Sequence, residues 1–348
     1  MAAWPKVGEA CVCPIIDFID EHLKPFIADP LQCLLPESEW PSASPKSKVY
    51  SDDANWFKIC AAGVERGIIC ECPEEEIFVN QLGDKVLNGA MGVDKWKEVD
   101  GVLEHHLRFI SIFTPINLYM HKINGDSFLL PQCCRLNMVV LADGEFVWDD
   151  GGDLQSCFNL FFLPKAWRGF CCFEKKVSRS IFGGPAHEQC YVAIRGVPMG
   201  WVNSVDLIQN FIRKFVFSTF EINPDWEVRG DRGLSLSTAA VVCMDGVDII
   251  TRLKIVRDAV AAAHGKLSFS KEGLSVEMAR FVTECQRRKL LLNVGKTVMQ
   301  DFCAGILGGE LDGVVGRLMH AREKGLRFAN RTLALLSIDK VPQVAMQH

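Results

Sequence analysis

Hydrophobic and polar positions follow two different periods along this chain, which predicts a mixture of helices and strands. Apolar residues lie three or four positions apart over 204–220, the spacing of one helix face. Residues 239–250 contain two short apolar runs joined at Asp245 and Gly246, a pattern typical of a β-hairpin. Hairpins packed on helices make an α+β fold. Helices are also expected at 95–106, 252–264, 274–288, 313–337 and from Pro164 onward, and strands at 107–119 (broken at Thr114-Pro115), 134–150 (with a turn at Asp143-Gly144) and 191–197.

The first fifty residues differ from the rest of the chain. A short amphipathic segment, IIDFIDEHLKPFI, leads into PESEWPSASPKSK, where Pro and Ser are frequent. Such a composition is typical of a linker or a poorly ordered loop. We therefore expect residues 1–50 to be an appendage to the folded part.

The overall composition is that of a packed globular protein. Of the 348 residues, 49% are apolar and 23% are charged, which excludes a disordered or fibrous chain. The formal net charge is −5, so nucleic acid would have to bind in a local basic groove. No apolar run is long enough to span a bilayer, and the N-terminus lacks the pattern of a secretory signal. We expect an intracellular protein of the cytoplasm or nucleus, not of a membrane.

The fifteen cysteines form no Cys-x-x-Cys pair, which argues against a zinc knuckle or a thioredoxin-type motif. In a chain of this length and composition they are expected to be reduced and buried.

Three segments carry the polar residues that suggest chemistry. Asp153 begins an apolar, aromatic stretch, residues 198–204 form a turn before a helix that contains Gln209, and Asp245 lies in the hairpin turn. Taken singly, each fits a structural role as a cap or a turn. A carboxylate in an apolar hairpin is costly to bury, however, unless it is paired or binds a cation. Two such carboxylates from different strands suit a magnesium site.

Together, these segments resemble the reverse transcriptases of retroelements and their relatives among the right-hand polymerases. The resemblance extends from about Gly89 to about Gly309. Four motifs carry it in the family's order: Asp153 with Phe158 five residues later, Pro198-x-Gly200-x-x-x-Ser204 with Gln209 in the following helix, the hairpin Cys243-Met-Asp245-Gly246, and Leu292-Asn293-x-x-Lys296.

The resemblance implies a palm of antiparallel sheet packed on helices, accompanied by fingers and with the thumb largely missing. The implied divisions are an N-terminal extension (1–50), fingers (51–150), a palm (151–300, with motifs at 153–158, 198–209, 243–246 and 291–297, and a fingers insertion at about 164–190), and a post-palm hairpin with the start of a thumb or connection (301–348).

The resemblance also implies roles for individual residues. Asp153 and Asp245 would be catalytic and would hold Mg²⁺ or Mn²⁺, and Phe158 would be the gate that selects deoxyribonucleotides. The remaining implied contacts are Gly200, Gln209, Lys296, Lys97 and Arg108 with the nucleotide, and Pro198, Trp201 and Ser204 with template and primer; Asn117 would end the fingers motif. A solvated strand face is the alternative for Arg108.

The chain departs from the family's pattern in the hairpin. Gly246 stands where the family has a second Asp, and Cys243 stands where it has Tyr. Glycine offers no side-chain ligand, so two carboxylates remain. Asp248 is expected to face away from Asp245 on its strand. Asp149 and Asp150 are candidates for the surroundings of Asp153.

The expected activity is template-directed DNA synthesis by two-metal phosphoryl transfer. Its partners would be an RNA or DNA template with a primer and deoxyribonucleoside triphosphates, while the sequence does not indicate an oligomeric state. Two alternatives stay open. One is a decayed retroelement protein that keeps the fold and binds nucleic acid without polymerising. The other is a structural or interaction protein whose motif matches are accidental.

Overall fold

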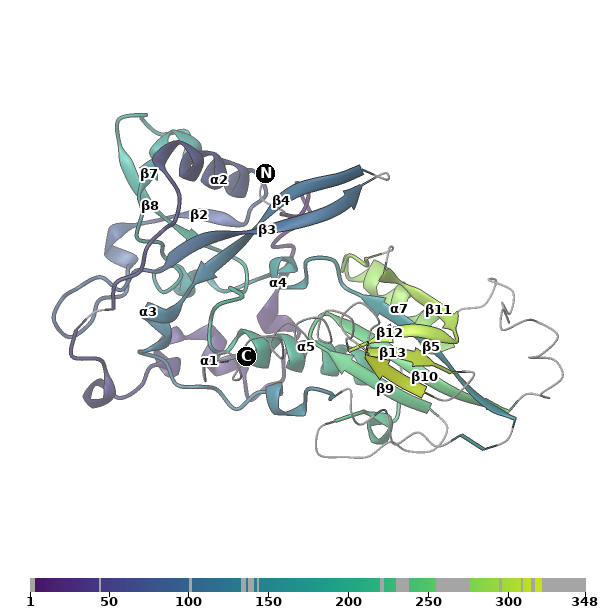
Figure 1. Ribbon diagram of the computed structural model, residues 1–348. Helices are drawn as coiled ribbons and strands as arrows, with labels where there is room; N and C mark the ends of the chain where they lie inside the picture. The colour runs from purple at the N-terminus through teal and green to yellow at the C-terminus, as the bar shows by residue number, and fades with distance from the viewer. Residues whose placement is uncertain are drawn as a thin grey trace, which may run out of the picture.

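The protein is a mixed α/β structure built from antiparallel sheets, as the computed structural model shows (Figure 1). A long hairpin, β3–β4, projects from the part of the molecule that contains α2 and β2, and a four-stranded sheet lies at the other end (Figure 1). The structure describes residues 4–43, 45–99, 102–132, 136, 141–142, 144–219, 222–229, 238–254, 276–293, 296–307, 309–313 and 317–320.

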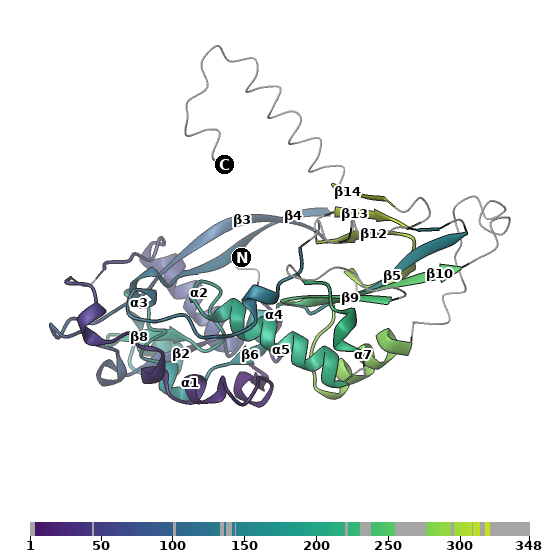
Figure 2. The same cartoon turned by 90° about the horizontal axis from the view of Figure 1, so that it is seen from below.

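The four-stranded sheet has the order β11-β5-β10-β9, with every neighbouring pair antiparallel. Helices α5 and α7 cover one of its faces, and the small sheet β12-β13-β14 lies over the other (Figure 2). The elements are β5 (Glu145–Asp153), α5 (Ser204–Thr219), β9 (Thr238–Cys243), β10 (Gly246–Lys254), α7 (Val276–Arg287), β11 (Val298–Asp301), β12 (Cys303–Ile306), β13 (Gly309–Asp312) and β14 (Arg317–His320).

The predicted helix at 204–220 is confirmed as α5, and the reason is its apolar stripe. Leu207, Ile208 and Phe211 are fully buried, and this face packs in the same core as Val242 and Val247 of the sheet. Close approach by α7 also depends on a glycine: a Cβ on Gly152 would lie 2.8 Å from the Phe281 ring. The helices therefore fix the position of the sheet on which the candidate carboxylates lie.

The opposite face of the sheet has a smaller apolar core of its own. Val147, Val241 and Ile250 of the sheet pack there with Ile306 and Leu311 of β12 and β13. These contacts cover the end of β5 and β10 that is remote from Asp153. The end near Asp153 does not belong to this cluster.

The predicted helix at 95–106 is wrong, because these residues belong to the long hairpin of β3 (Gly89–Val99) and β4 (Val102–Ile112). The rings of the cross-strand pair Trp96 and His105 are in contact, tilted by 44° with centroids 4.8 Å apart. The hairpin projects from the body, so consecutive residues such as 91–94 are all exposed. Polar positions therefore do not alternate with apolar core positions. Its sequence consequently lacks the period of a half-buried strand.

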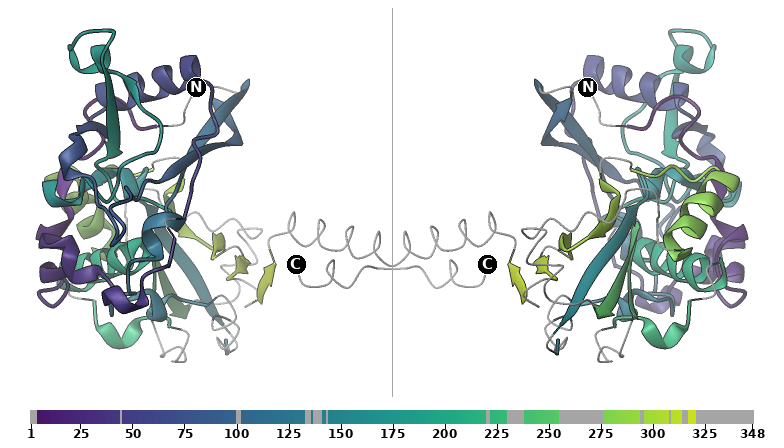
Figure 3. Two further views of the ribbon diagram at one scale, coloured as in Figure 1. Left: turned by 90° about the vertical axis from the view of Figure 1, so that its left-hand side faces the viewer. Right: turned by 90° about the vertical axis from the view of Figure 1, so that its right-hand side faces the viewer.

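The first fifty residues are not an appendage. Ile15, Ile19, Leu23 and Ile27 are all fully buried in the main core. Strand β1 (Cys13–Pro14) pairs in parallel with β6 (Phe161–Phe162), and α1 (Lys24–Ala28) follows. Figure 3 shows this purple segment spread along the molecule instead of forming a separate lobe. The four-residue spacing of these isoleucine and leucine side chains was the signal of burial, and the Pro and Ser content that follows it obscured that signal.

Other differences concern where elements begin and end. Asp153 ends a strand instead of beginning one, and the short helix α4 (Cys157–Leu160) follows. After Pro164 there is only a 3-10 turn at Lys165–Trp167. Residues 252–254 continue β10, and 317–320 form β14, in place of the expected helices; 255–264 and 321–337 lie outside the described residues.

The predicted helix at 274–288, the 239–250 hairpin and the 191–197 strand are confirmed in their types. The break at Thr114-Pro115 is confirmed, since β4 stops at Ile112 and a helical turn follows. Residues 134–135 and 137–140 lie outside the described residues. The remaining elements are α2 (Asp53–Glu65), β2 (Ile69–Cys72), α3 (Thr114–Asn117), β7 (Val177–Ser178) and β8 (Gln189–Ile194), with β2-β8-β7 forming a third sheet.

The cysteines that the structure describes are free thiols, and most are buried, as expected. Cys303 is the exposed one among them. Over the same described ranges, no helix is both long and apolar enough to cross a bilayer.

Candidate active site

The site lies where β5 ends beside the β9–β10 turn. Asp153, the last residue of β5, is opposite Gly246, the first residue of β10. Asp245 occupies the turn one residue earlier, and its carbonyl accepts a 2.6 Å hydrogen bond from the Leu154 amide. Two residues that are far apart in sequence are thus brought to the same end of the sheet by strand pairing.

The charge of Asp153 is close enough to affect the ionisation of Asp245. Burial raises the pKa of Asp245, and the neighbouring Asp153 charge raises it further. The buried Cys157 thiol is near both. Burial raises its pKa most, and the charges of Asp245 and Asp153 raise it further. Like charges at close range are unfavourable unless a proton or a cation separates them. The arrangement therefore favours cation binding when both carboxylates are ionised.

Lys296 and Asn293 also contact this site, and both do so at Asp153. The Lys296 Nζ lies 2.8 Å from Asp153 Oδ2, and the Asn293 Nδ2 lies 3.3 Å from the same oxygen. The backbone N–H of Asn293 also donates to the backbone carbonyl of Asp153, at 2.7 Å. The Lys296 side chain is 65% exposed, whereas that of Asp153 is only 19% exposed. The lysine therefore reaches the carboxylate from the solvent side.

Gln209 is not positioned to contact a nucleotide. It is fully buried in α5, where its Nε2 donates to the Val242 carbonyl at 2.9 Å. Its Oε1 accepts from the Met244 amide at 2.8 Å. Both ends of the side-chain amide are thus occupied by the backbone around the β9–β10 turn. The structure gives Gln209 a positioning role, since it holds the turn that carries Asp245.

The turn at 198–204 is held closed by side chains from two directions. The Ser204 hydroxyl donates to the Pro198 carbonyl across the turn. Asn117 donates to the Gly200 carbonyl and accepts from the Val202 amide, both at 2.9 Å. A Cβ on Gly200 would collide with the Ser111 carbonyl of β4, so the close packing of strand and turn requires glycine here. Asn117, expected as a fingers residue, instead fixes this turn.

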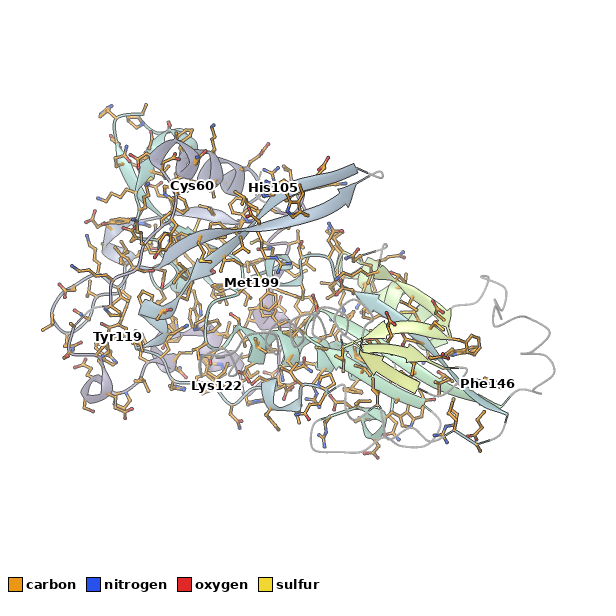
Figure 4. All side chains as sticks on the ribbon, viewed as in Figure 1. Cys60, His105, Tyr119, Lys122, Phe146 and Met199 are labelled. Carbon is orange, nitrogen blue, oxygen red and sulfur yellow. The ribbon has the colours of Figure 1, made fainter. Side chains whose placement is uncertain are left out.

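The three expected template contacts are buried, whereas Met199 in the same turn is exposed. Pro198, Trp201 and Ser204 are buried, and the Trp201 ring packs on Trp167 with centroids 4.6 Å apart. Their side chains are therefore core components and are not available to a template or primer. Met199 is 44% exposed and lies between the β3–β4 hairpin and the helices beneath it (Figure 4). Sequence reasoning missed it because the motif leaves that position unspecified.

The fingers candidates lie on the projecting β3–β4 hairpin, which forms a different sheet from the one that contains Asp153. Arg108 of β4 is exposed and opposite Val93. Lys97 is opposite Glu104 nearer the tip, and its side chain lies outside the described residues. The strand of Arg108, β4, pairs with β3 in a sheet separate from the one that carries the carboxylate pair. The solvated strand face is therefore what the structure shows for Arg108.

Phe158 lies in α4, five residues beyond Asp153. Its side chain is half-buried and packs against the main core. The preceding Ser156 has a left-handed backbone (φ 54°), which turns the chain sharply between the strand end and the helix. This turn brings an aromatic ring into the segment immediately after the carboxylate.

Asp248 shares a sheet face with Asp153. It is opposite Gly151, and Gly246 is opposite Asp153, so all four residues alternate onto one face. Asp245 lies in the turn, where strand alternation does not apply, so the expected orientation of Asp248 away from Asp245 stays a prediction. Within the residues that the structure describes, no group of three or more His, Cys, Asp and Glu side chains is arranged to hold a metal ion.

Comparison with known proteins finds similarity in structure but none in sequence. No family model matches the chain, and no curated protein matches it in sequence. A solved structure of a foamy viral protease–reverse transcriptase in complex with double-stranded DNA is similar, with a TM-score of 0.49 and 11% identity. The match covers 94% of this chain and 48% of that one, so the chain spans about half the length of this neighbour.

Proposed function

We propose that the protein is a nucleotidyltransferase of the reverse-transcriptase type, which extends a primer on an RNA or DNA template. The observation that carries the proposal is the convergence of Asp153 and Asp245 at one end of an antiparallel sheet, from positions 92 residues apart in sequence. On this proposal, residues 151–300 correspond to the palm, and the projecting hairpin belongs to the fingers. The intracellular location is likewise part of the proposal.

The residues at this site fit a hard divalent cation. Two carboxylates meet at a partly exposed sheet end, and the Asp153 charge raises the pKa of Asp245. Asp153 and Asp245 would hold Mg²⁺ or Mn²⁺, which when bound activates the primer hydroxyl and neutralises charge on the transferred phosphoryl group. The chain's own contribution is positioning. Gln209 fixes the turn of Asp245, and Asn293 fixes the end of β5.

Lys296 would bind the triphosphate of the incoming nucleotide. Its ammonium group is exposed and already lies at the carboxylate that the nucleotide's metal would approach. A flexible lysine acts as a point charge for phosphate, and it can leave Asp153 when a cation binds there. The template and primer backbones would bind over the exposed Met199 turn and the hairpin, with affinity falling as salt rises.

A catalytically decayed protein is the second candidate, and Gly246 is the observation that favours it. Without a carboxylate at this position, the hairpin supplies one metal ligand. Primer extension on an RNA template with Mg²⁺ separates the two candidates, with the Asp153→Asn variant as the control. Template-dependent extension by the wild type alone supports the enzyme, whereas equal signals from both proteins exclude it.

Restoring a carboxylate at residue 246 is expected to strengthen metal binding. A Cβ on Gly246 would lie 3.2 Å from the Gly152 carbonyl and 3.7 Å from Asp153 Oδ1, so a small shift accommodates it beside Asp153. We expect Gly246→Asp to lower the Mg²⁺ concentration for half-maximal extension by about tenfold, equivalent to about 1.4 kcal/mol. Gly246→Asn adds the same bulk without the charge. An equal Mg²⁺ dependence of the two variants would contradict the assignment.

Phe158→Ala is expected to weaken sugar selection. If the ring blocks a ribose 2′-hydroxyl, its removal lowers the preference for deoxyribonucleotides by about tenfold or more in kcat/KM. Phe158→Tyr keeps the bulk and serves as the matched control. Single-nucleotide incorporation with both sugar types measures the ratio, and an unchanged ratio in Phe158→Ala refutes the gate.

A further inference from the structure

Two carboxylates next to the candidate active site are not used by the proposed chemistry. Asp149 of β5 is fully buried, and neither of its carboxylate oxygens accepts a hydrogen bond from the residues that the structure describes. Asp248 of β10 lies diagonally across from it, since Asp248 is opposite Gly151 and Asp149 is opposite Ile250. Diagonal residues on one face of an antiparallel pair are within side-chain reach of each other.

Gly151 leaves a space that both carboxylates border. A Cβ built on this glycine would lie 2.5 Å from Asp248 Oδ1 and 3.4 Å from Asp149 Oδ2. The two oxygens therefore approach the same small volume from neighbouring strands. Any side chain at residue 151 would fill this volume.

The charges in this space are not balanced by the protein. Burial raises the pKa of Asp149, and the charges of Asp248, Asp150 and Asp301 raise it further. Burial and then the Asp153 charge raise the pKa of Asp248 to about 7. Across the described ranges, no Lys or Arg pairs with Asp149 or Asp248. A buried carboxylate of this kind is costly unless a proton or a cation compensates it.

We propose that Asp149 and Asp248 bind a divalent cation beside Gly151, at a site separate from Asp153 and Asp245. A cation is favoured over a shared proton because both oxygens of Asp149 lack a partner. A shared proton bridges one oxygen of each carboxyl group, whereas a hydrated cation reaches both. Asp248 is only partly buried, so it provides the route by which an ion enters from solvent.

The bound cation would join β5 to β10 directly behind the candidate active site. Asp153 ends the same strand as Asp149, and Asp245 precedes the same strand as Asp248. Occupancy would therefore stabilise the strand pair that carries both catalytic candidates. The inference does not depend on polymerase activity, because it rests on buried charge and geometry alone.

The number of Mn²⁺ ions bound per chain tests this site. It is measured by electron paramagnetic resonance of the free ion together with equilibrium dialysis. The starting protein is the Asp153→Asn, Asp245→Asn double variant, in which the candidate active site cannot hold the metal. We expect it to retain one Mn²⁺ per chain, and we expect adding Asp149→Asn or Asp248→Asn to abolish that binding. Failure of the double variant to bind Mn²⁺, or binding that survives Asp149→Asn, overturns the proposal.

Two further variants separate the site from general effects on folding. Asp150→Asn removes an equally buried charge from the adjacent residue, which faces the other side of β5, so Mn²⁺ binding should persist. Gly151→Ala keeps every charge but fills the space, so binding should be lost. Mn²⁺ should also raise the Tm of the double variant and of Asp150→Asn in that background, and leave the Tm of the Asp149→Asn protein unchanged. A Tm rise that persists in Asp149→Asn would contradict the site.

Discussion

Replacing Asp153 or Asp245 with asparagine is expected to lower the rate of primer extension by about 10³-fold or more. Asparagine keeps the size of each side chain but removes the negative charge that would hold the metal. Loss of either ligand should suffice, because Gly246 leaves the hairpin without a second carboxylate. Single-turnover extension of a labelled primer measures the rate without interference from product release.

The fold should survive these substitutions, which makes the rate loss interpretable. Burial and the Asp153 charge already raise the pKa of Asp245, so removing one charge relieves repulsion between the pair. We expect Tm values at or above that of the wild type in metal-free buffer. Asp53→Asn is the matched control, since Asp53 is 96% exposed on α2 and pairs with Lys175. A variant of Asp153 or Asp245 that extends primers as fast as Asp53→Asn would refute the proposed mechanism.

Arg213→Met is expected to destabilise the protein by about 3–5 kcal/mol. Arg213 of α5 makes two hydrogen bonds to the Glu227 carboxylate, at 2.5 Å and 2.9 Å, and one to Asp126 Oδ2 at 2.7 Å. The Glu227 side chain is only 2% exposed, so removing the guanidinium takes two charge-assisted hydrogen bonds from a buried carboxylate. Methionine preserves most of the packing volume. Urea denaturation, with the midpoint and slope compared to those of the wild type, measures the change.

A surface arginine provides the comparison. Arg179 also contacts two carboxylates, Glu71 and Glu188, but its side chain is 46% exposed. Arg179→Met should cost less than about 1 kcal/mol, since solvent screens exposed ion pairs. Similar losses of stability in Arg213→Met and Arg179→Met would show that burial does not strengthen the contribution of the Arg213 ion pairs.

The candidate carboxylate pair could be predicted because its signals are local. The apolar runs on either side of Asp245 predict the hairpin, and the spacing from Asp153 to Phe158 fixes the second segment. Strand pairing places Asp153 opposite Gly246 and so brings the two segments together, as the motifs imply. Periodicity was equally sufficient for α5, whose apolar face is continuous and fully buried.

The roles of the polar motif residues could not be predicted in the same way. A glutamine or serine in a motif can face a ligand or the backbone, and the sequence looks the same in both cases. Gln209 and Ser204 turned out to be fully buried and bonded to carbonyl or amide groups. The pairing partner of a motif residue is set by tertiary packing, which depends on contacts far away along the chain. How Asp248 faces Asp245 could not be predicted for a related reason, because strand alternation does not extend through a turn.

The burial of the N-terminal segment has a practical consequence for protein production. A fragment that starts at residue 51 would strip β1 from the edge of β6 and uncover the core positions that Ile15, Ile19 and Leu23 fill. Newly bared hydrocarbon of this kind promotes aggregation. Expression boundaries chosen from motif positions alone would therefore yield insoluble material, and inactivity of such a fragment would say nothing about the proposed activity.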